Sequence, residues 1–230
     1  VGEDFFGEQL RDAITEVGID ADGLCTDKEI HTTLAMVHTY PDGDRDFSFY
    51  RNPGADMMLN KEEICEDIIK ETKIFHFGTL SMTHEGVREA TKEAIRIAEE
   101  SGADNEIQWL TGEEDYTAGV NWIRERYQIP LILVSMGKEG SRAYYNGMMI
   151  EAKPFLQKNT IETTGAGDTF CGCVLHYICE HGMEGLEEEN LKEMLTFANA
   201  AASVITTRKG ALRVMPTRDE IQNLLGIISC

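Results

Sequence analysis

The chain is poor in positive charge. Its 230 residues include 21 lysines and arginines against 41 aspartates and glutamates, a formal net charge of -20 at pH 7. Binding to nucleic acid or to an anionic membrane surface depends on clustered basic side chains. The composition therefore argues against both kinds of partner. The sequence also lacks an apolar run long enough to span a bilayer. A globular protein with an acidic surface is the class that remains.

Several common site motifs are also missing. Six cysteines occur, but no C-x-x-C pair and no cysteine–histidine spacing typical of a zinc site. We expect reduced thiols and hence a cytoplasmic protein. No strand is followed by G-x-G-x-x-G, and no H-E-x-x-H occurs. Gly167 and Gly172 have the four-residue gap of a P-loop, but Cys173-Val174 replaces the required Lys-Ser/Thr.

The most informative segment that is present is residues 163–170, Thr-Thr-Gly-Ala-Gly-Asp-Thr-Phe. Apolar residues at positions i, i+3, i+4, i+7 and i+8 from Phe170 predict a helix directly after it. The start of that helix would offer unpaired N–H groups to an anion, and the glycines permit close approach. Asp168 adds a carboxylate there, a combination that phosphoryl transfer to an alcohol requires. A plain strand-to-helix turn with an acidic cap is the alternative interpretation.

The rest of the chain alternates between strand and helix patterns. The predicted elements are a hairpin at 33–51 turning at 41–44, helices at 61–72, 84–100, 115–127 and 188–206, strands at 73–78 and 131–135, and an Asn-Gly hairpin at 144–150. This order predicts an α/β domain with a mainly parallel central sheet flanked by helices. The hairpin at 33–51 is either a lid or a surface hairpin packed on the core. One place breaks the alternation, because residues 104–110 predict a second helix where a strand is expected.

Six segments in order resemble the ribokinase-like (PfkB) carbohydrate kinases, and among these most closely the fructokinases. They are V-G-x-D-x-F-G at 1–7, the lid and its continuation at 33–56, E-x-x-x-L-T-G at 106–112, a nucleotide loop at 134–140, the catalytic signature at 163–170, and a late nucleotide and cation loop at 208–211. The resemblance implies the ribokinase-like fold. The kinase core would comprise residues 1–32 and 57–230, with a β-lid at 33–56 over the sugar site.

The resemblance also implies an activity, which is transfer of the ATP γ-phosphoryl group to the primary hydroxyl of fructose. The products would be fructose 6-phosphate and ADP. Asp168 would be the base that takes the hydroxyl proton, and the backbone of Gly165, Ala166 and Gly167 would form an anion hole. Because a helix N-terminus favours the charged carboxylate, we expect Asp168 to orient the hydroxyl as much as to deprotonate it.

The nucleotide would contact two loops and one helix. The resemblance assigns Ser135, Gly137 and Gly140 to the nucleotide loop, although a simple turn would explain the same glycines. Gly210 would belong to the late loop. Asn199 falls where family members contact adenine, and the alternative is a polar position on a packed helix.

The cation and sugar contacts come from the resemblance as well. Glu106 would position Mg²⁺ through water, and a simple helix cap is its alternative role. A monovalent cation site, with K⁺ as the candidate, is implied at Glu162, Thr164, Thr206 and Gly210. Many members have Asp where Glu162 stands. Arg51, at the end of the second lid strand, is the candidate for a sugar contact.

Family members are longer than this chain. They begin with a strand and a Gly-Gly substrate motif, and they carry a further strand where this chain passes from Ala103 to Asp104. We therefore expect that the sequence omits segments at its N-terminus and near residues 103/104. A protein that truly lacked them would be without a sugar-binding carboxylate, and we expect it to be inactive. An intact mass close to 25.8 kDa would contradict the omission.

Alternative functions stay open. A kinase for ribose or for 2-keto-3-deoxygluconate belongs to the same class, but a sugar acid calls for more basic residues than Arg45 and Arg51 in the lid. The run of residues 49–53 with Ala55-Asp56 favours fructose. A catalytically silent sugar-binding paralogue is the third alternative, and the intact Asp168 argues against it. The apolar strand of the lid could pair with a second copy to form a homodimer.

Overall fold

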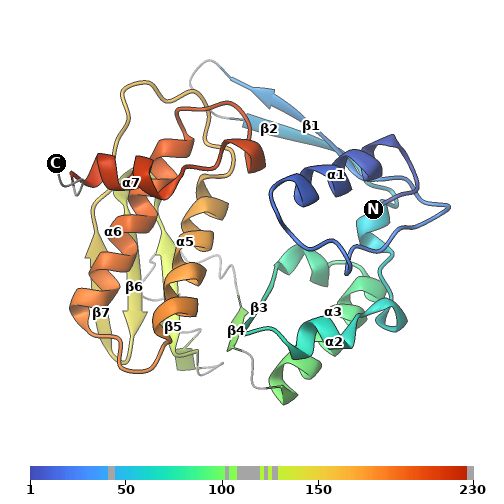
Figure 1. Ribbon diagram of the computed structural model, residues 1–230, viewed down its shortest axis with the longest axis horizontal. Coiled ribbons are helices and arrows are strands. Elements are labelled where there is room, and N and C mark those ends of the chain that lie inside the picture. The colour runs from blue at the N-terminus through green and yellow to red at the C-terminus, as the bar shows by residue number, and fades with distance from the viewer. Residues whose placement is uncertain (41–44, 102–103, 108–119, 122–123, 126–128, 227–230) are drawn as a thin grey trace. The chain divides into compact units, whose positions relative to one another are not determined.

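The computed structural model describes residues 1–40, 45–101, 104–107, 120–121, 124–125 and 129–226 (Figure 1). The chain forms two compact units. Unit 1 lies within residues 1–40 and 45–109, and unit 2 lies within residues 110–230. The predicted turn at 41–44, most of the predicted helix at 115–127 and Thr111-Gly112 of the E-x-x-x-L-T-G segment fall outside the described residues.

Unit 1 begins with helix α1 (Phe5–Glu16), which the sequence patterns did not predict. Asp4 caps it, because its carboxylate accepts the N–H of Gly7 at 2.9 Å. The same carboxylate accepts the N–H of Thr32 at 2.7 Å and the Thr32 hydroxyl at 2.8 Å. These hydrogen bonds, led by those from the backbone of Thr32 and Gly7, hold the pKa of Asp4 far below its ordinary range. The V-G-x-D segment thus ties the start of α1 to the chain that leads into the hairpin predicted at 33–51.

The hairpin predicted at 33–51 is confirmed. Strand β1 (Leu34–Thr39) pairs antiparallel with β2 (Arg45–Tyr50), with Leu34 opposite Tyr50. Two 3₁₀ turns follow, η1 (Ala55–Met57) and η2 (Lys61–Glu63). The predicted helix at 61–72 is shorter than expected, since only α2 (Glu66–Lys70) is α-helical there.

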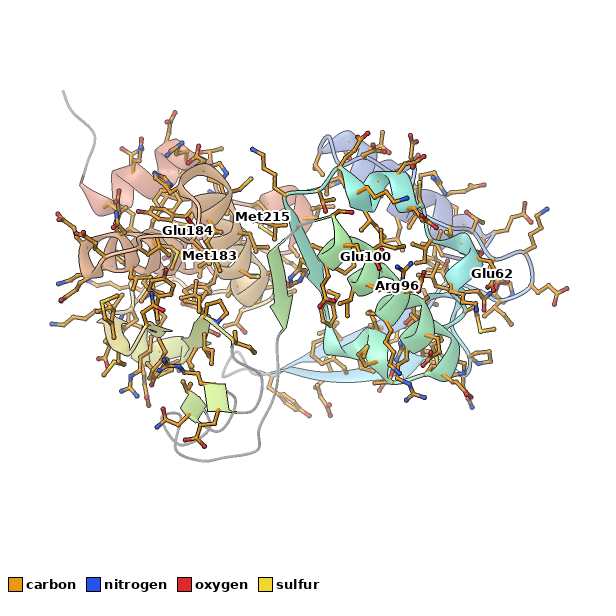
Figure 2. All side chains as sticks on the ribbon, turned by 90° about the horizontal axis from the view of Figure 1, so that it is seen from below. Glu62, Arg96, Glu100, Met183, Glu184 and Met215 are labelled. Atoms are coloured by element: carbon orange, nitrogen blue, oxygen red, sulfur yellow. The ribbon has the colours of Figure 1, made fainter. Side chains whose placement is uncertain are left out.

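A β–α–β unit occupies the rest of unit 1. Strand β3 (Ile74–Phe77) leads through η3 (Thr79–Met82) to helix α3 (Glu85–Glu100), and β4 (Asp104–Ile107) returns parallel to β3. The expectation of a helix from residue 104 is therefore wrong for residues 104–107. Pairing with β3 satisfies the backbone of β4, and this tertiary contact overrides the local pattern. On the surface of α3, Arg96 donates to Glu93 and, at 2.6 Å, to Glu100 (Figure 2).

Unit 2 contains a three-stranded antiparallel sheet in the order β5-β6-β7. The strands are β5 (Leu131–Ser135), β6 (Ser141–Tyr145) and β7 (Met148–Ala152), and η4 (Gly137–Glu139) precedes β6. Asn146 and Gly147 form the predicted β6–β7 turn, with φ of 46° and 83°. Among the described strands, β5 pairs antiparallel with β6, and parallel pairing occurs between β3 and β4.

Of two long helices in this unit, α6 (Glu188–Ile205) packs on the sheet and α5 (Ala166–His181) packs on α6 (Figure 1). Both confirm the predicted helices, and α5 stops at Gly182, whose φ is 76°. Nine of the 18 residues of helix α6 are buried, and the helix contacts β6, β7 and α5. A turn η5 (Leu212–Val214) and a short helix α7 (Arg218–Leu225) complete the unit, and α7 packs on α6.

The structure also bears on the cysteine thiols and on possible membrane-spanning helices. The five cysteines within the described part of the chain are free. Burial raises the pKa of Cys173 to about 11, so this thiol stays protonated near neutral pH. None of the helices in the described ranges is both long and apolar enough to cross a membrane.

Candidate active site

The Gly165 turn is closely packed, and its backbone has a left-handed conformation that favours glycine. Gly165 is the N-cap of α5 and has a φ of 76°. A Cβ built there would lie 3.1 Å from Cδ1 of Ile205 and 3.3 Å from Cβ of Ala211. The left-handed backbone and the close approach both disfavour a side chain. The catalytic signature therefore rests against the end of α6 and the loop that follows it.

The start of α5 is accessible to an anion. Asp4 caps α1 and Thr217 caps α7 by side-chain hydrogen bonds, whereas no described side chain caps α5. Gly167 is exposed, and a Cβ added there meets no described atom within 4 Å. The N–H groups of a first helical turn have no intrahelical partner, so this end of α5 attracts negative charge. Asp168 is exposed in the same turn.

The N–H of Ala166 has a partner of its own. It donates to the carbonyl oxygen of Thr163 at 3.2 Å, which closes the turn. An anion hole was expected from the backbone of Gly165, Ala166 and Gly167. Of these three, Gly167 is the exposed residue, so its N–H is the best placed to bind an anion.

Thr169 is a site residue that the sequence patterns did not single out. Its hydroxyl donates to the carbonyl oxygen of Gly165 at 2.7 Å and contacts the sulfur of Met215 at 3.1 Å. The side chain is buried and braces the turn from the helix side. The sequence does contain a signal for this role, because a hydroxyl directly after Asp168 can form a hydrogen bond back to the preceding turn.

The segment before the Gly165 turn is joined to the loop after α6. The N–H of Ile161 donates to the carbonyl oxygen of Thr206 at 2.8 Å, and the N–H of Gly210 donates to the Glu162 carboxylate at 2.7 Å. Gly210 has a φ of 111°. The structure thus brings Glu162, Thr206 and Gly210 together, and Thr164 lies between Glu162 and Gly165 in the same segment. The oxygen atoms here are of the type that hard cations bind.

The predicted nucleotide loop is a closed turn at the end of β5. The N–H of Met136 donates to the carbonyl oxygen of Gly140 at 2.8 Å, and Gly137 and Gly140 have φ of 56° and 98°. A Cβ at Gly140 would lie 2.2 Å from the carbonyl oxygen of Ala152. Gly140 is therefore required for packing on β7. Ser135 is the last, exposed residue of β5.

Asn199 is engaged with the backbone. Its side-chain amide donates to the carbonyl oxygens of Ala152 and Lys153 at 3.2 and 3.1 Å, and the residue is 8% exposed. Asn199 therefore has a structural role in the packed helix, which was the alternative to an adenine contact.

Arg51 and Glu106 belong to unit 1. Arg51 donates to the Asp56 carboxylate through Nε at 2.7 Å, and Thr33 donates to the other oxygen of the same carboxylate. Burial acts to raise the pKa of Asp56, but the hydrogen bonds from Arg51 and Thr33 outweigh it and lower the pKa. Glu106 lies inside β4, opposite His76, so the expectation that it starts a helix is wrong.

Within the described residues, no group of three histidine, cysteine, aspartate or glutamate side chains could hold a metal ion. At the Gly165 turn, a cation could take oxygen atoms from phosphate, water, backbone carbonyls and single carboxylates. Mg²⁺ bound to a nucleotide is held in that way, so the residues present fit a cation that arrives with its nucleotide.

Comparison with curated proteins finds fructokinases. A probable fructokinase-4 of Arabidopsis thaliana is 33% identical, over 98% of this chain and 80% of that protein. A fructokinase of Solanum tuberosum is 34% identical, over 98% of this chain and 78% of its own length. The first alignment runs over 264 positions, 34 more than the 230 residues of this chain. The relative therefore carries residues within the aligned span that this chain lacks.

Solved structures and the family pattern agree with this result. The crystal structure of fructokinase with bound ATP from Xylella fastidiosa superposes with a TM-score of 0.84 at 26% identity, over 98% of this chain and 83% of that one. The ribokinase-like α/β fold is thereby confirmed. The family pattern described as pfkB family carbohydrate kinase matches residues 1–108 and 101–218, and these two matches overlap at 101–108. With these matches over most of its length, the chain belongs to the pfkB family of carbohydrate kinases.

Proposed function

We propose that this protein transfers the γ-phosphoryl group of ATP to the primary hydroxyl of fructose, giving fructose 6-phosphate and ADP. The observation that carries the proposal is the uncapped start of α5 with the exposed Asp168 in its first turn. The fructokinase relatives support fructose as the sugar. Membership of a carbohydrate kinase family supports the class of reaction.

The chemistry follows from the turn. The sugar hydroxyl oxygen attacks the γ-phosphorus, the bond from that phosphorus to the β–γ bridging oxygen breaks, and ADP leaves with the electron pair. The hydroxyl proton passes to the carboxylate of Asp168. Because the transition state is loose, that proton leaves late, and Asp168 also serves to aim the oxygen. The N–H of Gly167 and the helix dipole stabilise the charge on the transferred group.

The nucleotide contacts that we propose lie in unit 2. Ser135, Gly137 and Gly140 at the end of β5 and Gly210 in the late loop are candidates for backbone contacts with ATP. Asn199 holds the end of β7 in place. Its contribution to adenine binding would therefore be indirect, through the position of β7 beside the loop at 135–140.

For the cations, we propose Mg²⁺ near Glu106, held mostly by phosphate oxygens and water, and K⁺ near Glu162, Thr164, Thr206 and Gly210. Mg²⁺ would supply neutralisation of phosphate charge. The Glu162 carboxylate already accepts the N–H of Gly210, which keeps the loop in place when no cation is bound.

We propose Arg51 as a sugar contact. Its guanidinium group has five N–H donors, and the hydrogen bonds to Asp56 hold it by one edge. Such an arginine is fixed in direction yet can still donate to a sugar hydroxyl. The lid strands also expose apolar side chains at Met36, Val37, Phe47 and Phe49, which supports a homodimer in which a second copy covers them.

The length of the active protein is part of the proposal. The two family matches overlap at residues 101–108, and the alignment with one relative extends over 34 more positions than this chain has. We propose that the active protein carries a further internal segment there. An intact mass well above 25.8 kDa would support this, and a mass at that value in an active protein would contradict it.

The decisive experiment is an assay of ADP release with ATP, Mg²⁺ and one sugar at a time. We expect turnover with fructose to exceed that with ribose and with 2-keto-3-deoxygluconate, and to be lost in Asp168→Asn. Faster turnover of another sugar would correct the substrate and keep the reaction class. A folded protein that binds ATP and turns over no sugar would overturn the proposal.

A further inference from the structure

The loop that joins α6 to α7, residues 206–217, forms one wall of the Gly165 turn. Ala211 in this loop lies close to Gly165, with its Cβ 3.3 Å from the position that a Cβ of residue 165 would take. Met215, labelled in Figure 2, lies in the same loop and contacts the hydroxyl of Thr169, which in turn bonds to Gly165. The position of the loop and the position of the turn are therefore linked at two points.

Arg208 holds this loop from within. Its guanidinium group donates to the carbonyl oxygen of Val214 at 3.0 Å and reaches that of Met215 at 3.4 Å. The other terminal nitrogen donates to Glu220, in the first turn of α7. Arg208 thus ties the beginning of the loop both to its end and to the next helix.

Glu220 is itself fixed in direction. One carboxylate oxygen accepts from Arg208, and the other accepts the N–H of Thr217 at 2.8 Å as part of the α7 capping box. These hydrogen bonds, first that from the backbone of Thr217 and then that from Arg208, lower the pKa of Glu220. The carboxylate therefore stays charged and keeps the guanidinium in one orientation.

We propose that Arg208 is a positioning residue for phosphoryl transfer. Through Ala211 and Met215 it sets where the Gly165 turn lies, and so where Gly167 and Asp168 meet the transferred group. The inference rests on the proposed function, because Arg208 would act on the same turn that carries out the proposed phosphoryl transfer.

The chemistry of the contact requires arginine. Two carbonyl oxygens and one carboxylate are bound at once by a planar group with donors on several edges. A lysine ammonium keeps the charge but cannot span the three acceptors. The Arg208 side chain is 28% exposed and that of Glu220 is 42% exposed. An ion pair this exposed contributes little to global stability, so its loss should act mainly on the local geometry.

The chain offers a matched control. Arg142 on β6 donates to Glu151 on β7 at 2.9 Å, and its side chain is also 28% exposed. Both pairs lie in unit 2. Arg142 has no contact with the Gly165 turn among the described hydrogen bonds.

The test compares Arg208→Met, Arg208→Lys and Arg142→Met in the fructose assay. We expect kcat to fall by about ten- to a hundredfold in both Arg208 variants, as small misplacements of reacting groups do. The KM for fructose should stay within about twofold, and Arg142→Met should keep its kcat. Melting temperatures of the Arg208 and Arg142 variants should be similar.

A second measurement is independent of activity. We expect amide hydrogen exchange in residues 163–169 to become faster in Arg208→Met and to stay unchanged in Arg142→Met. Unchanged kcat and unchanged exchange at this turn would overturn the inference. An Arg208→Lys variant with full kcat would overturn the requirement for the planar group. If the unmutated protein turns over no sugar, the proposed function fails, and the exchange result alone decides whether Arg208 positions the turn.

Discussion

The side-chain amide of Asn199 donates to the carbonyl oxygen of Ala152, 47 residues earlier, at 3.2 Å. The same carbonyl oxygen is the atom that a side chain at Gly140 would strike. The end of β7 therefore fixes both the helix that carries Asn199 and the loop that we propose binds ATP. This junction explains why a buried asparagine is found on an otherwise apolar stretch of α6.

We predict that Asn199→Ala lowers the free energy of unfolding by about 1–3 kcal/mol, because the buried carbonyl oxygen of Ala152 and the partly buried one of Lys153 lose their donor. Urea unfolding measures the change. Thr196→Ala is the control, since its exposed hydroxyl bonds only to Lys192 of the same helix. Equal stability of the two variants would show that the amide contributes little to the junction.

Asp168→Asn should lower kcat by about 10²–10⁴-fold, the usual contribution of a positioned acid–base group. The binding of ATP should change little, because the amide keeps the shape of the carboxylate. Steady-state kinetics with isothermal titration of ATP separates the two effects. Glu189→Gln, which removes a carboxylate from the first turn of α6, should keep its activity. An Asp168→Asn variant with more than a tenth of normal kcat would contradict the assigned role.

Two glycines of one turn should respond differently to the same change. Gly165→Ala should destabilise the protein by about 1–3 kcal/mol, because a side chain is strained on its left-handed backbone and because Ile205 and Ala211 would have to shift to admit a Cβ. Gly167→Ala should keep or raise stability by up to about 1 kcal/mol, because it sits in a helix facing open space. Its kcat should nevertheless fall, because the methyl group hinders approach of the phosphoryl group.

Thermal unfolding and kinetics on both glycine variants check this pair. A Gly167→Ala variant with normal kcat would show that the anion does not approach this position. A Gly165→Ala variant of unchanged stability would contradict the described packing.

The pH dependence of stability should reflect Asp4. Hydrogen bonds from the backbone of Thr32 and Gly7 place its folded-state pKa below the unfolded value, which is about 4. Its stabilising contribution is therefore complete above about pH 4 and is lost as the pH falls toward the folded-state pKa. We predict that Asp4→Asn is less stable than the unmutated protein at pH 7 and that the difference shrinks between pH 4 and pH 2.

Melting temperatures at pH 7, 4, 3 and 2 follow this difference. Asp12→Asn, on the exposed side of the same helix, is the control and should show no comparable convergence. A constant difference between Asp4→Asn and the unmutated protein across this range would contradict the prediction.

The long helices and both hairpins follow from sequence patterns because their signals are local. Residues at helical spacing mark α3, α5 and α6, and Asn146-Gly147 marks the β6–β7 turn. Helix α7 had a readable signal as well, since Thr217 and Glu220 form a capping box behind Pro216.

Helix α1 and strand β4 could not be predicted in the same way. Phe5, Phe6 and Leu10 of α1 are exposed, so their spacing marks no buried face, and the helix start depends on Asp4 binding Thr32. Strand β4 exists because β3 offers it a partner. Both depend on contacts far apart in sequence.

The candidate site shows the same division. The Gly165 turn and Asp168 stand out in the sequence because glycines and a carboxylate begin a helix there. The hydrogen bond from the N–H of Gly210 to Glu162 joins residues 48 positions apart. The hydrogen bond from Arg208 to the carbonyl oxygen of Val214 forms because the loop folds back on itself. Such contacts arise from the tertiary structure and leave no local pattern.

The turn between β6 and β7 provides a tolerant point for labelling the protein. Asn146 and Gly147 are exposed, and a Cβ at Gly147 meets nothing within 4 Å. The strands on either side keep their pairing from Tyr145–Met148 onward. A fluorophore or a short peptide tag attached at this tip would leave the buried residues of β6 and the start of α5 undisturbed. The hairpin thus gives single-molecule and tethering experiments an attachment point away from the proposed chemistry.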